Sequence, residues 1–219
     1  MPRRLTFYFD YVSHNAYLAW TQLDRLAARY ELEIRLAPVL FAGMLQAHGQ
    51  LGPAEIAPKS RWMLRDVLRK ARRFNVPIAP PVAHPFNPLL ALRCTCSPLA
   101  DRHREALVSA LFEAVWVASR DVTDPAVVAD VANGAGLDGG ALVEDAATET
   151  TKGRLRAGTE AALANEVFGV PSFVVDGMVF WGCDDLPTLA SWLAGDDPLT
   201  DADIEPWLAV PSAVRRRRP

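Results

Sequence analysis

Alternating hydrophobic and polar positions at the start of the chain predict two strands separated by a helix. Residues 5–9 alternate in a strongly aromatic run that is typical of a buried strand. Apolar residues then recur at helical spacing from Ala16 to about Tyr30, and a second alternating run ends at Pro38. A strand–helix–strand unit takes a right-handed crossover, so we expect the two strands to be parallel.

The middle of the chain has a helical pattern almost throughout residues 59–164. A short helix and an irregular loop are expected before it, over 39–58, and a proline-rich connector at 77–85 cannot be helical. Asn87 and Pro88 mark a helix start, with an asparagine cap and a proline in the first turn. Further helices are predicted over 107–118, from Asp124 to near Gly134, and twice between Gly139 and Asn165.

Strand patterns return near the end of the chain. SFVV (172–175) and MVFW (178–181) flank Asp176-Gly177, a dipeptide that suits the type I′ turn of a β-hairpin. A last helix is predicted over 184–194, because apolar residues recur there at helical spacing and a glycine follows.

These elements describe an α/β chain whose sheet is encoded in two separate parts. We expect one domain formed by residues 1–40 and 166–195, an inserted helical domain over 41–165, and a C-terminal tail over 196–219. The tail is acidic and ends in Arg215–Arg218, for which a disordered terminus is predicted.

Composition and charge narrow the class of protein. Half of the 219 residues are hydrophobic and the net charge is −3, which allows a substantial core and argues against a nucleic-acid role. The basic residues between Arg61 and Arg73 are interpreted as a solvated helix face. No apolar run is long enough to span a membrane, and the N-terminus leads directly into a strand, so a cytoplasmic protein is expected.

Cysteine and histidine spacing argues against two kinds of chemistry. Cys94 and Cys96 form C-x-C rather than the C-x-x-C of thioredoxin-like redox sites, and both are interpreted as small buried residues. The four histidines show no metal-ligand spacing, so no metal is expected.

Ser13 is the first candidate for chemistry, between the first strand and the first helix. A helix N-terminus presents free backbone N–H groups and the positive end of the helix dipole, so it favours an anion such as a thiolate. The Ser13 hydroxyl is placed to donate a hydrogen bond to such an anion. The alternative is that Ser13 only caps the helix, which is a common role of serine.

The pattern DYVSHNAYLA, from Asp10 to Ala19, resembles the start of the DsbA-like branch of the thioredoxin superfamily. More narrowly, it resembles 2-hydroxychromene-2-carboxylate isomerases and kappa-class glutathione transferases, in which a serine replaces the first redox cysteine and faces the sulfur of glutathione. The resemblance implies a thioredoxin-like fold with a large all-α domain inserted between its βαβ and ββα halves. It also implies that dithiol–disulfide exchange is absent, and it shows one departure, since His14 stands where the family usually has proline.

A second match covers residues 169–186. Val170-Pro171 resembles the cis-proline segment of the thioredoxin family, and a trans proline at a strand start is the alternative. By resemblance, Val170 would hold the cysteinyl part of glutathione, while Cys183 and Asp184 would hold the γ-glutamyl end. Asp184 is also suited to cap the next helix. Asp185 departs from the arginine usual in the family and adds a negative charge.

A third match lies in the helical insertion, where PKSRWMLRDVLRK and HPFNPLLALR resemble segments of the isomerase family. By resemblance, Lys59 would face glutathione or a substrate carboxylate, and Gln50 stands near a position where the family often has asparagine. Asn87 and Arg93 are substrate-binding candidates by the same match. A helix cap and a surface ion pair are the respective alternatives.

Together these matches imply a glutathione-dependent cis–trans isomerase of the 2-hydroxychromene-2-carboxylate type, acting on an aromatic-catabolism intermediate by reversible thiolate addition. Glutathione would be regenerated and so would be a cofactor, and the relatives suggest a homodimer. A kappa-like transferase and a redox-inactive thioredoxin-fold binding module are the alternatives. His14 adds a hypothesis of its own, because a protonated imidazole would favour the thiolate and attract an anionic substrate.

Overall fold

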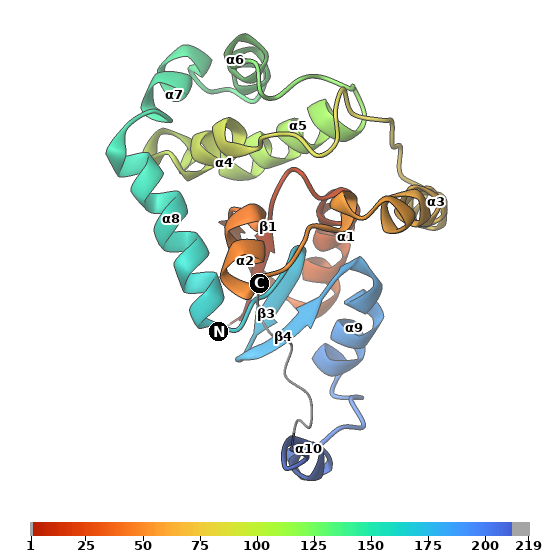
Figure 1. Cartoon of the computed structure of the whole chain (residues 1–219). Helices are drawn as coiled ribbons and strands as arrows, with labels where there is room; N and C mark the ends of the chain where they lie inside the picture. The colour runs from red at the N-terminus through yellow and green to blue at the C-terminus, as the bar shows by residue number, and fades with distance from the viewer. Residues whose placement is uncertain (1, 212–219) are drawn as a thin grey trace.

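The computed structural model describes residues 2–211 and contains one four-stranded mixed sheet (Figure 1). β1 and β2 are parallel, as predicted, whereas β3 pairs antiparallel with both β1 and β4. Strand β1 is central, so it joins both ends of the chain in one sheet. The strands, in their order across the sheet, are β2 (Leu32–Pro38), β1 (Arg3–Phe9), β3 (Ser172–Val175) and β4 (Met178–Trp181).

Ten α-helices occur among the described residues, and none of them is both long and apolar enough to cross a membrane. Nearly all lie within a few residues of the predicted positions. The helices are α1 (His14–Tyr30), α2 (Phe41–His48), α3 (Ala57–Phe74), α4 (Leu89–Cys96), α5 (Arg104–Trp116), α6 (Pro125–Gly134), α7 (Gly139–Asp145), α8 (Glu149–Ala164), α9 (Leu186–Ala194) and α10 (Asp201–Leu208).

Different helices cover the two faces of the sheet (Figure 1). Leu5, Phe7 and Phe9 of β1 are completely buried in one cluster with residues of α1 and α9. Tyr8 points the other way, into a second cluster with residues of α2 and α8. Successive strand side chains alternate between faces, so the aromatic run of β1 supplies both layers of the core.

One hydrophobic cluster extends from the sheet into the helical insertion. The Tyr11 and Phe112 ring centroids are 4.9 Å apart, and those of Phe9 and Phe112 are 5.6 Å apart. Trp116 also donates a hydrogen bond from its indole nitrogen to the carbonyl oxygen of Tyr11 (3.0 Å). The end of β1 is therefore anchored to α5, while the domain boundaries given above stay a prediction.

Two predicted helix starts need correction. Helix α9 begins at Leu186 rather than Asp184, because Cys183–Asp185 form a separate 3₁₀ turn. Helix α4 begins after Pro88, which occupies the N-cap position expected for Asn87. The Asn87 side chain still accepts a hydrogen bond from a backbone N–H of the first turn (3.1 Å), so it keeps part of the capping role.

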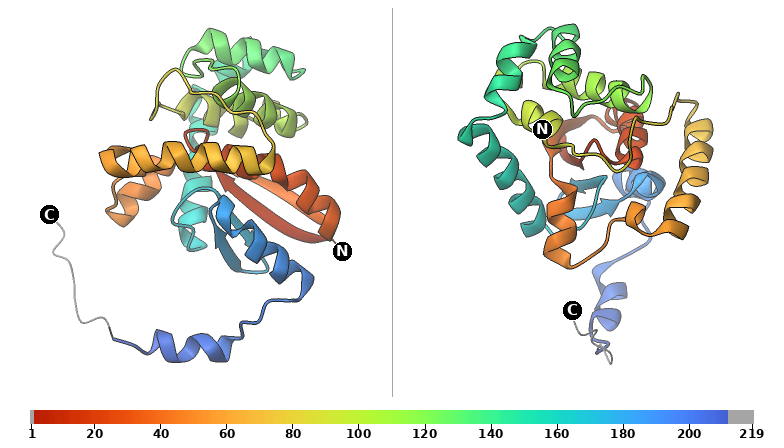
Figure 2. Two further views of the ribbon diagram at one scale, coloured as in Figure 1. Left: turned by 90° about the vertical axis from the view of Figure 1, so that its right-hand side faces the viewer. Right: turned by 45° about the horizontal axis from the view of Figure 1, so that its top comes forward.

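Helix α10 was not predicted from the sequence. Thr200 precedes it, and Asp203 accepts hydrogen bonds from both the backbone N–H (2.9 Å) and the hydroxyl (2.6 Å) of Thr200. This local capping begins a helix without help from the core. Both views in Figure 2 show α10 standing apart from the rest of the chain. The predicted disorder of Arg215–Arg218 lies outside the described residues.

Candidate active site

Ser13 lies where the end of β1 turns into α1. Its hydroxyl oxygen accepts a hydrogen bond from the N–H of Ala16 (3.2 Å), so the helix-capping role is confirmed. The same hydroxyl donates to the carbonyl oxygen of Val170 (3.5 Å), in the loop before β3. The Val170–Pro171 peptide bond is cis, as predicted. The structure therefore brings the serine and the cis-proline segment together from opposite ends of the chain.

Asp10 holds the turn that presents Ser13. Its carboxyl group is completely buried, and its two oxygens accept hydrogen bonds from the N–H groups of Val12 (3.0 Å) and Phe41 (2.9 Å). Burial raises the pKa of Asp10 to about 7, although both hydrogen bonds act in the opposite direction. Phe41 begins α2, so Asp10 ties the Ser13 turn to the first helix of the insertion.

The imidazole of His14 is 7% exposed and lies among aromatic rings. The ring centroids of His84 and Trp116 are 5.9 Å and 5.8 Å from it. Burial, with a smaller contribution from His84, lowers the pKa of His14 to about 4, so the ring is neutral at pH 7. The hypothesis of a protonated imidazole is therefore wrong. His14 instead forms an uncharged aromatic wall beside Ser13.

Asp184 lies in the 3₁₀ turn after β4 and is paired within the chain. Its side chain is 67% exposed, and its Oδ2 accepts a hydrogen bond from Nζ of Lys70 (2.6 Å), on α3. The same ammonium group lies 2.5 Å from Oδ2 of Asp66, one helical turn earlier. Two carboxylates from separate elements therefore share one buried lysine.

The three cysteines are free thiols and all are buried. Burial raises the pKa of Cys94 to about 12 and that of Cys96 to about 11, which confirms both as small buried residues. Cys183 donates a hydrogen bond to the side-chain oxygen of Asn15 (3.2 Å), and burial raises its pKa to about 12. None of them is a thiolate at pH 7.

Four predicted site residues make no hydrogen bond or ion pair with Ser13, Val170 or Asp184 among the described residues. Gln50 and Lys59 are exposed; Gln50 lies in the segment between α2 and α3, and Lys59 lies in the first turn of α3. Asn87 is exposed beside the start of α4. Arg93 is half-buried, and its Nε is buried without a hydrogen-bond partner. The surface ion pair that was the alternative for Arg93 is absent from the described part of the chain.

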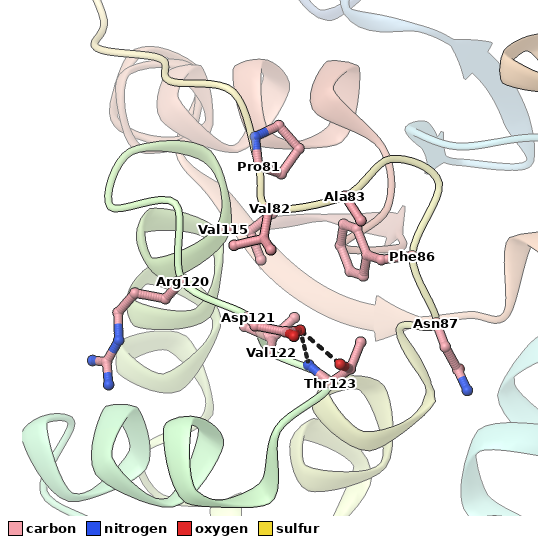
Figure 3. A pocket seen from close by; sticks show the side chains of 10 residues that line it. All are labelled: Pro81, Val82, Ala83, Phe86, Asn87, Val115, Arg120, Asp121, Val122 and Thr123. Atoms are coloured by element: carbon pink, nitrogen blue, oxygen red, sulfur yellow. Dashed lines mark hydrogen bonds between the residues drawn. The ribbon is translucent and has the colours of Figure 1, made fainter.

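Among the cavities of the described structure, two have predicted site residues in their walls. One, of about 210 Å³, lies between the proline-rich connector and the loop before α6, and Asn87 is the predicted site residue in its largely apolar wall (Figure 3). The other, of about 360 Å³, lies where α1, α3 and α9 meet, and it reaches the Asp184 turn. Its wall also contains three arginines, Arg25, Arg29 and Arg73.

Residues 4–194 match a family model described as a DSBA-like thioredoxin domain. The chain belongs to this family. A 2-hydroxychromene-2-carboxylate isomerase from Sphingobium xenophagum is 32% identical to this DSBA-like chain over 198 residues, covering 88% of the chain and 99% of the relative. Human glutathione S-transferase kappa 1 is 28% identical over 233 residues, covering 99% of this chain and 98% of the relative.

The fold of this DSBA-like protein has a close counterpart among solved structures. The structure of a 2-hydroxychromene-2-carboxylate isomerase matches it with a TM-score of 0.81 at 27% identity, covering 88% of this chain and 95% of the other. The predicted family and the predicted thioredoxin-like fold, divided by helices, are confirmed.

Other residues of this DSBA-like site were missed from the sequence. Lys70 was assigned to a solvated helix face, yet it is 5% exposed. Lys70 follows Asp66 by four residues, a spacing that suits an ion pair on one helix, and this pattern could have indicated the pairing from the sequence. The contact with Asp184 joins distant parts of the chain, so no local pattern could reveal it. The same holds for the packing of His84 and Trp116 around His14.

Proposed function

We propose that this protein is a glutathione-dependent cis–trans isomerase of the 2-hydroxychromene-2-carboxylate type, acting on a small aromatic-catabolism intermediate. The observation that carries the proposal is the Ser13 hydroxyl at the N-terminus of α1, facing the backbone of Val170. The isomerase relative at 32% identity supports the same reaction class.

The residues around Ser13 fit a bound thiol tripeptide. The backbone N–H of Val170 makes no hydrogen bond within the described residues, so it is available to pair with the cysteinyl backbone. The N–H of Asp184 likewise has no partner in that part of the chain, and together with the adjacent Cys183 it suits the carboxylate of the γ-glutamyl end. The second oxygen of the Asp184 carboxylate suits the amino group.

Ser13 has the central role in this mechanism. When bound, glutathione would supply a thiolate for reversible addition to a conjugated carbon of the substrate, which would allow rotation about the former double bond before the thiolate leaves and the double bond re-forms. The Ser13 hydroxyl, which makes a long contact with Val170, would donate to the sulfur, and the helix N-terminus would contribute positive potential. Both effects favour the thiolate over a thiol of pKa ~8.5.

The remaining candidates are proposed to bind the substrate and the far parts of the cofactor. Neutral His14, packed on Trp116, offers an aromatic wall to an aromatic substrate. Lys59 would neutralise a carboxylate of the substrate or cofactor. Gln50 is proposed for the cofactor, and Asn87 and Arg93 for the substrate.

A kappa-like transferase is the second candidate, because human kappa transferase matches 99% of this chain. Product analysis separates the two enzymes, since only a transferase consumes glutathione in proportion to product. A redox-inactive binding module is the third candidate, and it would show no turnover with either substrate class.

We also propose that the protein is a homodimer. Leu64 and Leu68 of α3 are 60% and 50% exposed, and their four-residue spacing places them on one face of the helix. Burial of this face against a second copy would remove two large apolar side chains from water.

Ser13→Ala tests the proposed mechanism. Loss of a hydroxyl donor to a thiolate should cost roughly 1.5–3 kcal/mol, expressed as a lower kcat and a raised pKa of the bound thiol. Steady-state kinetics with varied glutathione and ultraviolet titration of the thiolate measure both quantities.

Thr148→Ala is the matched control for the loss of a helix cap. Thr148 caps α8 by accepting a hydrogen bond from the N–H of Thr151 (3.2 Å), so its removal should lower stability and leave the thiol pKa unchanged. If Ser13→Ala behaves like Thr148→Ala, Ser13 is only a cap and the mechanism is refuted.

A further inference from the structure

Lys70 is a buried cation paired with Asp184, the residue proposed above to bind the amino group of glutathione. Its side chain is 6% exposed, and its Nζ lies 2.6 Å from Asp184 and 2.5 Å from Asp66. Asp66 is 19% exposed and lies on the same helix, whereas Asp184 is 67% exposed in the turn after β4. The ammonium group therefore bridges an inner carboxylate and an outer one.

The charge of Lys70 is secured by its partners. Burial acts to lower the pKa of Lys70, but hydrogen bonds with Asp184 and Asp66 more than offset this effect and leave the pKa raised. The lysine is therefore an ammonium ion throughout the neutral range. The cavity that reaches Asp184 is also lined by Arg25, Arg29 and Arg73.

A second ammonium group at Asp184 would meet this charge at short range. In glutathione the amino group belongs to the γ-glutamyl residue, the end proposed to lie on the Cys183–Asp185 turn. Asp184 Oδ2 already accepts from Lys70, so a ligand amino group that binds this carboxylate approaches a like charge. Like charges that share one carboxylate reduce the attraction that each receives.

We propose that the Lys70 ammonium group occupies the position beside Asp184 where the amino group of a γ-glutamyl thiol would bind. Lys70 thereby sets which thiols the site accepts. The inference rests on the proposed function, because it assumes that Asp184 faces the γ-glutamyl end of a thiol ligand. Lys70 cancels most of the contribution that a free amino group would make to binding. The site therefore accepts γ-glutamyl thiols whose amino group is acylated about as well as glutathione itself.

Binding of glutathione and N-acetylglutathione to the full chain, measured by isothermal titration calorimetry, tests this proposal. The parent protein should bind the two thiols with Kd values within about threefold of each other. In Lys70→Met the two carboxylates lose the cation that they share, so Asp184 is free to pair with the amino group of glutathione. The Kd of glutathione should then be at least about tenfold lower than that of N-acetylglutathione.

Two further variants keep the test sound. Lys70→Met leaves the partly buried Asp66 carboxylate without its ion-pair partner, which threatens stability. The double variant Asp66→Asn/Lys70→Met removes that charge and should still prefer the free amino group, because Asp184 then stands alone. Arg69→Met removes an exposed positive charge from the neighbouring position of α3 and should bind both thiols as the parent does.

The outcomes distinguish this inference from the proposed function. If the parent already prefers glutathione by about tenfold, or if neither Lys70 variant changes the preference, Lys70 is not the occupant and the thiol site stands. If neither thiol binds to the parent or to the variants, the use of a glutathione-like cofactor fails, and the inference fails with it.

Discussion

At the residue scale, His14 shows how burial changes the chemistry available next to Ser13. Its Nδ1 is buried without a hydrogen-bond partner among the described residues, and rings of His84 and Trp116 lie close by. An uncompensated buried imidazole resists protonation, because the charged form would lose its hydration. The neutral His14 ring therefore behaves as an apolar surface beside Ser13, although histidine is a polar residue.

We predict that His14 makes the fold sensitive to acid. Its pKa of about 4 in the native protein lies below the usual 6.5, so the unfolded chain binds more protons between these values. The stabilising contribution is complete above the unfolded pKa and is lost as the pH falls through about 4. His14→Phe should therefore lose less unfolding free energy than the parent between about pH 7 and 5.

Urea unfolding at both pH values measures this difference. Asp10 has the opposite slope, because its raised pKa makes it stabilising at low pH, so only the comparison of variant with parent isolates His14. His48→Gln, which replaces an exposed histidine of α2, is the control. Equal slopes for parent and His14→Phe would show that the imidazole titrates in the native state as it does in the unfolded chain, and would contradict the lowered pKa.

The sequence predicted the residues of the site that are marked by local patterns. Ser13 was indicated by a strand-to-helix transition, and Val170 by the resemblance of Val170-Pro171 to the cis-proline segment of the thioredoxin family. Lys70 could not be found in this way, because a lysine within a basic helix has the same local pattern whether it is buried or solvated. Its burial depends on Asp184, which a separate part of the chain supplies.

At the scale of elements, α6 and α7 make close backbone contact at Gly139. A Cβ atom added to Gly139 would lie 2.0 Å from the backbone oxygen of Ala129. A Cβ atom added to Gly140 would have its nearest neighbour at 3.5 Å, an oxygen of Asp138. The two glycines are adjacent in the first turn of α7, yet only one permits the helices to touch.

We predict that Gly139→Ala destabilises the protein and Gly140→Ala does not. Overpacking against backbone should cost about 1–3 kcal/mol or more, since neither helix can yield without moving its neighbours. Alanine at Gly140 should change stability by at most about 1 kcal/mol, because its helix propensity is the higher. Unfolding free energies of the two variants measure the contrast, and equal values would contradict the contact.

Element prediction from the sequence succeeded where one pattern dominates. The alternation in β1 and the Asp-Gly turn of the hairpin are local signals, and both strands of that hairpin are present. Helix α10 was missed because its helix start depends on a capping threonine in a region of mixed polarity. The 3₁₀ turn at Cys183–Asp185 was missed because tertiary contacts of Asp184 and Cys183 compete with helix extension.

At the scale of the whole molecule, we predict that Leu68→Glu converts the proposed dimer to a monomer. The substitution places a charge on the exposed apolar face of α3, next to Leu64, where a second copy would have to desolvate it. Size-exclusion chromatography with light scattering measures the mass. Arg73→Glu, on the opposite side of the same helix from Leu64, should remain dimeric. A monomeric parent would contradict the dimer proposal.

The division of the sheet also sets the order in which the molecule can assemble. During synthesis β1 and β2 emerge first, and the free edge of β1 has to wait for β3, which follows the whole insertion. Closing so long a loop costs conformational entropy. Contacts such as the hydrogen bond from Leu40 N–H to the Thr159 hydroxyl (3.0 Å) draw the far end of the insertion back to β2. Packing of the inserted helices therefore brings the β3–β4 hairpin close to the free edge of β1.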